Sequence, residues 1–479
     1  MPLILPGNSG SATAATGFNV SNSLRFNRGS ADHLTRTVSA SSTTKATYSV
    51  WLKRGFTFGS EQCLYAIDDG TNEVRINFTT ADTIQVFHYA GGYTYQVATN
   101  RVFRDPSAFY NIIIVVDTTQ GTDTNRVKIY VNGVQETSLA TTNYPGQNTD
   151  SFFFQSATLY LGVEENGSSN PIDGYIAEHI VCQGQALAPT SFGEFDDSGI
   201  WKPIDGLADL TFGNDGFYLQ FKEAGTSANA SGMGADTSGN TNHFAVNNLT
   251  AVDQSTDTCT NNFCTLNPLT KRPTANGTIA EGNLQYTAST GDSSIFGTMA
   301  IPPGMKVYFE VKLVSNTAQN AIGIHNVYDP GGTFVKGGSA SGMYSFKPRG
   351  SGSVTQYFNN GSSTNTSIDN PANDTILGVA IDNANGQIHY HIAGTYINSS
   401  DPTDNDPVAL VTGFGGATEQ YLHFSLDTTT TQPSNQFNFG SPPYSESGGE
   451  SDADGHGNFN QAVPSGYFAL CTKNLAEYG

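Results

Sequence analysis

Short runs of residues that alternate between apolar and polar, or are continuously apolar, follow one another along most of the chain. Each run covers about four to eight residues and is bounded by Gly, Asn, Asp or Thr, which is the pattern of β-strands separated by turns. In the run TYSVWLK, Tyr48, Val50 and Leu52 fall on one face of the expected strand, and Trp51 and Lys53 fall on the other. The pattern predicts an all-β fold.

The runs form two series, one over residues 23–189 and one from Asn283 to the C-terminus. The order of motifs differs between the series, so we predict two different β-sandwich (jelly-roll) domains rather than a repeat. Asn132-Gly133 and Asn385-Gly386 predict tight turns, because Asn and Gly tolerate positive φ.

Between the two series lies a stretch that is rich in Gly, Asn, Ser and Thr, a composition that favours turns over helix or strand. Apolar residues still recur through it, so we expect an ordered, turn-rich seam that packs across one or both sandwiches. These apolar residues are Phe244, Val246, Leu249, Phe263 and Leu266. The predicted organisation is an N-terminal extension at 1–22, a first sandwich at 23–200, the connecting seam at 201–269 and a second sandwich at 270–479.

Composition narrows the class of protein. Charged residues make up 13% of the 479 residues, well below the usual share, and 52 Gly with abundant Thr, Ser and Asn take their place. This profile is typical of an extracellular or virion β-protein. Hydrophobic content of 37%, with 29 Phe and 22 Tyr, is ample for packed cores and argues against disorder.

The net charge of −21 is unevenly distributed. From Gly350 to Thr472 there is no Lys or Arg, whereas carboxylates recur from Asp369 to Asp454. Such a surface repels nucleic acid and anionic membranes unless cations bridge the two, so we expect no nucleic acid partner and no membrane insertion. The acidic balance is otherwise a device for solubility. The N-terminal MPLILPGNSG has the features of neither a signal peptide nor a membrane span.

Three groups of motifs carry a resemblance. The strings VWLKRG, IIIVVD, KIYVNGV, LYLGV and DGYIAEHIV resemble a laminin-G or concanavalin A-like jelly roll, and YFEV, YSF, GVAIDNANGQI and FNFG resemble a SPRY-type sandwich. The pieces DGFYLQF, DTSGN, NNLT and TNNF, which lie between them, resemble a segment of marine bacteriophage virion proteins.

The resemblance implies a structural protein of a phage virion, assembled in the host cytoplasm. Both domain types recognise surfaces through loops on a rigid sandwich, so a tail fibre or receptor-binding adhesin is the first interpretation. A capsid decoration or head-fibre protein is the alternative, and a glycan hydrolase comes third. The expected partners are other virion proteins and a host surface glycan, and the expected assembly is a homo-oligomer, a trimer or a hexamer.

No catalytic constellation is found, so we expect a protein that is not an enzyme. Glycosidases with a jelly roll need paired carboxylates on one strand face. The nearest string, Glu194-Phe195-Asp196-Asp197, falls in a turn-like stretch. Glu164 and Glu165 are adjacent, and adjacent strand residues point to opposite faces, so we expect that they cannot act together.

No cofactor is expected, with Ca²⁺ as the alternative in one loop. Asp452, Asp454 and Asn458 have oxygen ligands spaced as in some calcium loops, although the downstream bidentate Glu is missing. His389 and His391 share a strand face, where a cross-strand structural role competes with metal binding.

The candidates for ligand contact are Tyr89, Tyr93 and Tyr95, which surround the turn Ala90-Gly91-Gly92. Exposed aromatic rings stack on sugar faces and on protein partners, and Tyr93 and Tyr95 are expected to share a face. Packing of these rings into the sandwich is the competing interpretation.

Overall fold

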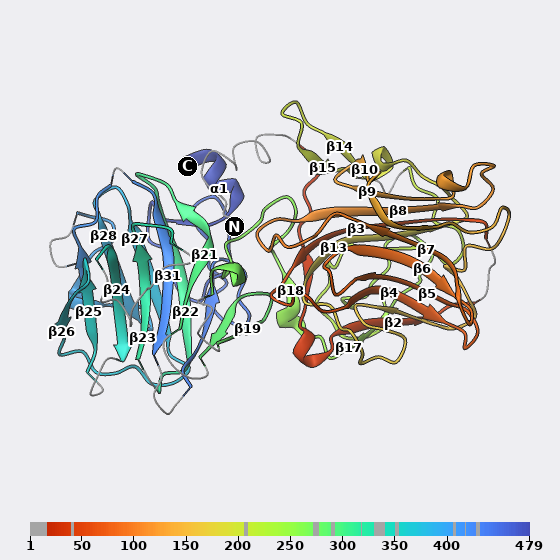
Figure 1. Cartoon of the computed structure of the whole chain (residues 1–479). Coiled ribbons are helices and arrows are strands. Elements are labelled where there is room, and N and C mark those ends of the chain that lie inside the picture. Colours follow the sequence, from red (N-terminus) through yellow and green to blue (C-terminus); the bar gives the residue numbers. More distant parts are fainter. Residues whose placement is uncertain are drawn as a thin grey trace. The chain divides into compact units, whose positions relative to one another are not determined.

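The structure of the protein is a computed structural model. It describes residues 17–39, 43–205, 209–271, 277–288, 293–317, 319–329, 341–349, 354–405, 409–416, 418–427 and 432–479. The chain divides into two compact units, with the division between Thr260 and Asn261. Over these residues each unit contains two large sheets of almost entirely antiparallel strands, which confirms the predicted all-β fold (Figure 1).

The first unit is a sandwich of two layers (Figure 1). The strands of its sheet A, in spatial order, are β10 (Val134–Gln135), β9 (Val127–Val131), β8 (Tyr110–Asp117), β3 (Lys45–Arg54), β13 (Gly174–Gln183), β1 (Ser23–Phe26) and β18 (Gln254–Ser255), with β16 (Phe217–Leu219) also paired to β13. Those of its sheet B are β11 (Leu139–Asn143), β7 (Tyr93–Thr99), β6 (Ile84–Tyr89), β5 (Glu73–Phe78), β4 (Gln62–Asp68), β12 (Thr158–Leu161), β2 (His33–Thr37) and β17 (Ala245–Asn247). A separate hairpin joins β14 (Gly193–Phe195) to β15 (Trp201–Pro203).

The second unit also has two sheets. The strands of its sheet C are β19 (Thr278–Ala280), β20 (Gln285–Thr287), β32 (Ser434–Asn438), β22 (Lys306–Ser315), β27 (Ile376–Asp382), β28 (Gln387–Ile392) and β29 (Thr395–Tyr396), with β30 (Val411–Thr412) and β33 (Phe468–Ala469) paired to β28 and β22. Those of its sheet D are β21 (Ser293–Ile301), β31 (Gln420–Asp427), β23 (Gln319–His325), β24 (Met343–Arg349), β25 (Gln356–Asn359) and β26 (Ser362–Asn365). The helix α1 (Thr472–Tyr478) follows, and short 3-10 helices span Arg28–Ser30, Asp123–Asn125, Pro189–Ser191, Ala251–Asp253, Pro268–Thr270 and Ile397–Ser399.

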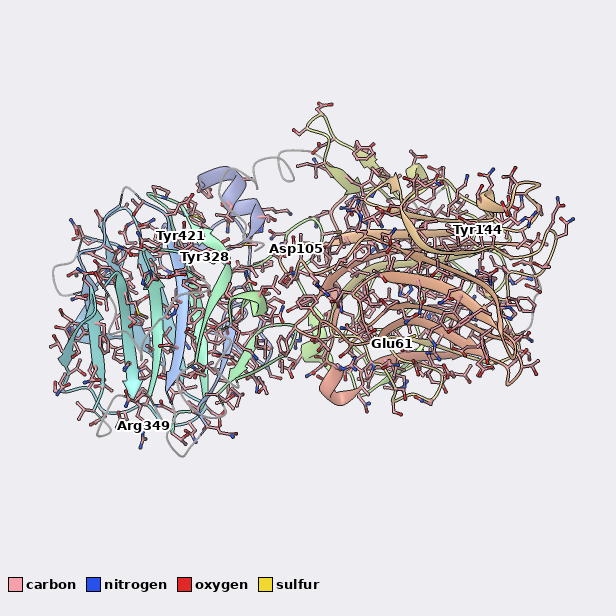
Figure 2. All side chains as sticks on the ribbon, in the orientation of Figure 1. Glu61, Asp105, Tyr144, Tyr328, Arg349 and Tyr421 are labelled. Atoms are coloured by element: carbon pink, nitrogen blue, oxygen red, sulfur yellow. The ribbon has the colours of Figure 1, made fainter. Side chains whose placement is uncertain are left out.

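The alternation predicted for the strand that became β3 is confirmed. Tyr48, Val50 and Leu52 lie in the core between the two sheets of the first sandwich, where side chains fill the space between the layers (Figure 2). Trp51 lies on the opposite face, in a smaller buried cluster with Val20 and Trp201. Both faces of β3 are therefore buried.

The segment predicted as a seam at 201–269 is divided between the units. β16, β17 and β18 pair with strands of the first sandwich, and Phe217, Phe244 and Leu249 lie in its core. Phe263 instead packs in a cluster of the second unit. The residues up to Thr260 are thus part of the first sandwich rather than a connector.

Polar side chains of this segment form hydrogen bonds with the N–H and carbonyl groups of its irregular backbone. One oxygen of Asp236 accepts hydrogen bonds from the backbone N–H groups of Tyr218 and Ser238, both at 2.9 Å. The other accepts from the N–H of Asn242 at 2.8 Å. The side-chain amide of Asn240 donates to the carbonyl of Gly216 at 3.0 Å. Buried irregular backbone needs such partners, which explains the abundance of Asn, Asp and Ser.

The turns predicted at Asn132-Gly133 and Asn385-Gly386 differ in length. Asn132 and Gly133 have φ of 48° and 78° and connect β9 directly to β10, which confirms the two-residue turn. In the second sandwich, Asp382 pairs with Gln387, which leaves a four-residue loop in which Gly386 has a positive φ of 65°. The Asp382 carboxylate widens this turn, because one of its oxygens accepts the N–H groups of both Ala384 and Asn385 at 2.9 Å.

We expect Phe244→Ala to destabilise the first sandwich by about 3–5 kcal/mol, because the fully buried ring leaves a cavity in the core. Both tryptophans of the chain, Trp51 and Trp201, lie in this unit, so their fluorescence during urea denaturation reports its unfolding alone. Tyr93→Ala removes a ring that is 51% exposed and should change the free energy of unfolding by less than about 0.5 kcal/mol. An unchanged tryptophan transition in Phe244→Ala would show that the segment is dispensable to the first sandwich.

Candidate functional site

Two tyrosines stand side by side on the hairpin of β6 and β7. Tyr89 and Tyr93 are directly opposite each other across the hairpin and are 40% and 51% exposed. Their ring centroids lie 5.4 Å apart at an interplanar angle of 76°. Phe87, which is buried, packs edge-on against Tyr93 at 5.3 Å. We call Tyr89 and Tyr93 the tyrosine pair.

Tyr95 does not belong to this surface. His88 pairs with Tyr95 and Tyr89 pairs with Tyr93, so Thr94 is an extra residue that forms a β-bulge. The bulge turns Tyr93 and Tyr95 to opposite faces of the sheet, and the prediction that they share a face is wrong. Tyr95 is 1% exposed, and its hydroxyl donates to the carbonyl of Ser151 at 3.1 Å in the core.

A charged cluster lies beside the rings on the same face of sheet B. Arg75 is opposite Phe87 across β5 and β6, with its guanidinium 5.6 Å from the ring centroid. It forms ion pairs with Glu73, Glu164 and Glu165. Three carboxylates surround one guanidinium, so the cluster carries excess negative charge.

The premise that Glu164 and Glu165 lie on a strand is wrong. They follow the end of β12 in a loop rather than on a strand, so strand alternation does not separate them. Both contact the guanidinium of Arg75. The side chain of Asn170 fixes the loop, because it donates to Glu164 and also to Glu61 at 3.1 Å.

A row of side-chain amides continues across the same face. The amide of Gln96 donates to Gln85 at 2.9 Å, and the amide of Gln85 donates to Asn77 at 3.1 Å. Gln85 and Phe87 alternate with the core residues Ile84 and Val86, so the amides and the rings share the outer face. Asn77 and Gln85 are buried, so only Gln96 of this row is partly exposed. Exposed aromatic rings, carboxylates and amides are the groups that hold the C–H faces and hydroxyls of sugars.

Asp452, the first of the candidate calcium ligands, is bonded within the protein. Both oxygens of Asp452 accept hydrogen bonds within the protein, from the N–H groups of Asp454, His456 and Ala469 and from the side chain of Asn474. Asp452 is 5% exposed and organises the loop, whereas Asp454 lies on the surface. In the parts of the chain that the structure describes, no group of three or more His, Cys, Asp or Glu is arranged to hold a metal ion.

His389 and His391 both lie buried in β28. The Nδ1 atom of His391 accepts the N–H of Gly394 at 3.1 Å, and its Nε2 atom lies 2.8 Å from the hydroxyl of Tyr308. Burial lowers the pKa of His391 to about 4, so the ring is neutral at pH 7. Nε2 therefore carries the proton and donates to Tyr308, and His391 links β28 to β22 across the intervening strand β27.

The acidic string at 194–197 forms the tip of the β14–β15 hairpin. Asp196 accepts the N–H groups of Ser198 and Ile200, both at 2.9 Å, and forms an ion pair with Lys202 at 2.8 Å. These contacts hold a turn and leave no carboxylate pair on a strand face.

Glu178 is a buried carboxyl group that the sequence pattern did not single out. It has a φ of 49° in a β-bulge of β13, is 5% exposed and accepts a hydrogen bond from the hydroxyl of Tyr218. Burial raises the pKa of Glu178 to about 8. Its burial separates it from solvent and from the tyrosine pair's surface, so its titration bears on stability.

The geometry defines a two-layered β-sandwich, with the partly exposed tyrosine pair on the outer face of sheet B. Residues 28–187 match the family model described as the concanavalin A-like lectin/glucanases superfamily. The match falls within the first sandwich. No curated protein matches the chain.

Solved structures show weaker likenesses. The SPRY domain of human HERC1 is similar at a TM-score of 0.28 and 10% identity, over 36% of this chain and 96% of that domain. A putative carbohydrate binding protein from Bacteroides ovatus ATCC 8483 is similar at 0.27 and 15%, over 48% and 58%. The heptameric SAP-like pentraxin from Limulus polyphemus is similar at 0.27 and 12%, over 36% and 80%. Among the described residues, no helix is both long enough and apolar enough to cross a membrane.

The raised pKa of Glu178 predicts that the first sandwich loses stability as pH rises. The folded state holds the proton up to about pH 8, whereas the unfolded carboxyl releases it near 4.5. The stabilisation is therefore complete below pH 4.5 and is lost towards pH 8, at up to about 1.4 kcal/mol per pH unit. In Glu178→Gln, tryptophan-detected urea denaturation should show a shallower fall across this window. Glu223→Gln, at an exposed position, should follow the wild type, and identical profiles for all three proteins would contradict the assignment.

Proposed function

We propose that the protein is a non-enzymatic binding protein that recognises a glycan through the tyrosine pair of its first sandwich. The observation that carries the proposal is the exposure of Tyr89 and Tyr93, at 40% and 51%, on a sheet face that also carries Arg75 with its carboxylates and the partly exposed Gln96. The lectin-type family match over this part of the chain supports a binding role.

The chemistry of the face favours a neutral glycan. Tyrosine rings stack against the C–H face of a pyranose, and carboxylates and amides bind its hydroxyl groups. Three carboxylates against one guanidinium disfavour a polyanionic chain, because like charges repel at short range. A neutral polysaccharide of the host surface fits both features.

The loss of one ring of the tyrosine pair should weaken glycan binding. We expect Tyr93→Ala to raise the Kd for a neutral host polysaccharide about tenfold, which corresponds to ~1.4 kcal/mol. Tyr93→Phe keeps the ring and should bind like the wild type. The measurement is titration of immobilised polysaccharide by biolayer interferometry, after a glycan array has identified the ligand.

Phe195→Ala is the matched control, because Phe195 is also 51% exposed but lies on the β14–β15 hairpin. Its Kd should be unchanged. Equal losses in Phe195→Ala and Tyr93→Ala would mean that the tyrosine pair has no specific role.

At a finer level, the protein is proposed to be a tail fibre or receptor-binding adhesin of a phage virion, assembled in the host cytoplasm as a trimer or hexamer. The motifs of the segment between the two series and the composition of the chain support this proposal. A capsid decoration or head-fibre protein is the alternative. Immunogold imaging of intact particles separates tail from head, and light scattering gives the oligomeric state.

The N-terminal extension is proposed to attach the protein to the particle. Residues 1–16 lie outside the described residues, whereas Val20 is buried with Trp51 and Trp201 in the first sandwich. Deletion of residues 1–16, which leaves Val20 in place, should preserve the tryptophan transition but abolish incorporation into virions. Particles that incorporate the truncated protein normally would refute the anchoring role.

A further inference from the structure

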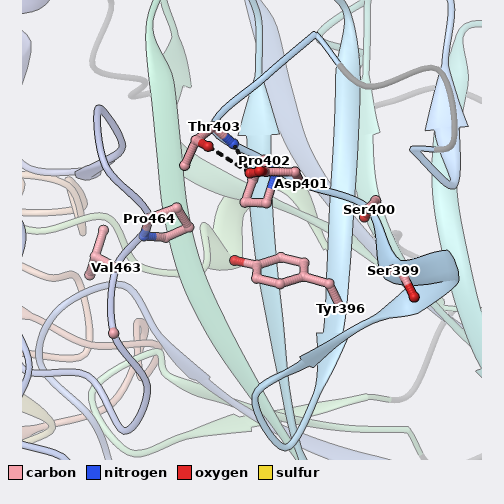
Figure 3. Close-up of a pocket in the computed structure, with 9 residues that line it drawn as sticks. Tyr396, Ser399, Ser400, Asp401, Pro402, Thr403, Val463 and Pro464 are labelled. Carbon is pink, nitrogen blue, oxygen red and sulfur yellow. Dashed lines mark hydrogen bonds between the residues drawn. The ribbon is translucent and has the colours of Figure 1, made fainter.

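A pocket of about 430 Å³ lies on the second sandwich, between two segments that are far apart in the sequence (Figure 3). One wall runs from Tyr396 in β29 to Thr403, and the other is formed by residues 462–464. Its volume falls within the range of small-molecule sites, about 300–1,000 Å³. It shares no residue with the tyrosine pair.

Buried contacts hold the first wall in place. The hydroxyl of Tyr467 donates to the carbonyl of Pro402 at 2.9 Å, and Tyr467 is fully buried in a core cluster of the second unit. Tyr396 pairs with His391 across β28 and β29, with their ring centroids 5.1 Å apart. His391 is in turn held by Tyr308. The pocket is therefore formed before any ligand arrives.

The backbone of this wall is strained. Asn398 and Ser399 are consecutive non-glycine residues with φ of 59° and 54°, in the left-handed region. Asn tolerates this region, whereas Ser399 is held there at a cost of about 1–3 kcal/mol, and such residues cluster at ligand sites. Ser399 and the following Ser400 both line the pocket. The strain thus lies at the place where two hydroxyl groups enter the lining.

The lining suits a ligand with many hydroxyl groups. Ser399, Ser400 and Thr403 supply hydroxyls, and Asp401 supplies a carboxylate that accepts the N–H and the hydroxyl of Thr403 at 2.8 and 2.6 Å (Figure 3). These hydrogen bonds lower the pKa of Asp401, which keeps the carboxylate ionised. The hydroxyl of Tyr396 is buried and has no hydrogen-bond partner among the described residues.

The residues that line the pocket include no cation. The chain has no Lys or Arg from Gly350 to Thr472, a span that includes both walls. A ligand with a carboxylate or phosphate would meet Asp401 with no cation in the lining to balance it. The hydroxyl-rich lining and the missing positive charge therefore select the same ligand class.

We propose that this pocket is a second saccharide site, which binds a neutral pyranose unit between the wall at 396–403 and the segment at 462–464. The inference does not rest on the proposed function of the first sandwich, because it uses no residue of that face. It makes the two sandwiches separate contact points for carbohydrate.

The test uses the full chain with Tyr89→Ala and Tyr93→Ala, so that the first sandwich does not contribute. The probes are the methyl pyranosides of glucose, galactose and mannose, and the methyl glucuronoside as the anionic counterpart. Saturation-transfer NMR detects binding, and competition titrations rank the probes. At least one neutral pyranoside should bind, and the glucuronoside should bind about tenfold more weakly.

Two pairs of variants locate the binding. Ala462→Trp places bulk in the pocket and should abolish the signal, whereas Ser465→Trp adds the same bulk to the same segment outside the lining and should keep it. Asp401→Asn should bring the affinity for the glucuronoside closer to that for the neutral sugar, and Asp404→Asn should not.

Three results would overturn the proposal. They are the absence of a signal from every neutral pyranoside, a signal that survives Ala462→Trp, and equal binding of the glucuronoside and the neutral sugars. Failure of the proposed function would instead appear in the parent chain, as polysaccharide binding that is indifferent to Tyr93→Ala. The two failures are therefore distinguishable.

Discussion

Strand β13 is buried along its whole length, so both faces of sheet A must be covered. The core between the sheets covers one face. The stretch around Phe192 and Phe212, together with the cluster of Val20, Trp51 and Trp201, covers the other. The segment that follows the jelly-roll motifs is thus required by the burial of this sheet. The outer face of sheet B is covered less completely, because the tyrosine pair on it is partly exposed.

Buried ion pairs connect residues 253–257 to strands of sheet A. Arg25 on β1 contacts Asp253 at 3.2 Å, and Lys53 on β3 contacts Asp257. Lys53 is 1% exposed and lies 4.7 Å from the ring centroid of Tyr175. A buried pair gives little net stability, but the loss of one partner leaves an uncompensated charge at a cost of about 3–5 kcal/mol. These pairs therefore select one position for residues 253–257.

The second sandwich covers one of its sheets with its own C-terminal part. Phe459, Tyr467 and Ala469 pack on Tyr308 and Ala380, which belong to β22 and β27. Beneath this cover, Glu310 accepts hydrogen bonds from the N–H groups of residues 460 and 461 and from Asn438. The proposed saccharide pocket lies where this C-terminal part meets the wall at 396–403, so its position follows from how the sheet is covered.

Local patterns in the sequence determined the all-β fold, the inward face of β3 and the Asn132-Gly133 turn, because each depends on neighbouring residues alone. The tyrosine pair could also be predicted from the sequence, since Tyr89 and Tyr93 flank a glycine turn. Only the tertiary structure decided that Tyr95 is buried, because the bulge at Thr94 depends on how β7 pairs with β6. It likewise brought Glu164 and Glu165 to one guanidinium, and it joined residues 396–403 to 462–464. Spacing along a chain predicts on which face of one element a side chain lies. Contacts between distant segments depend instead on how the sheets and the segments that cover them pack together in the folded protein.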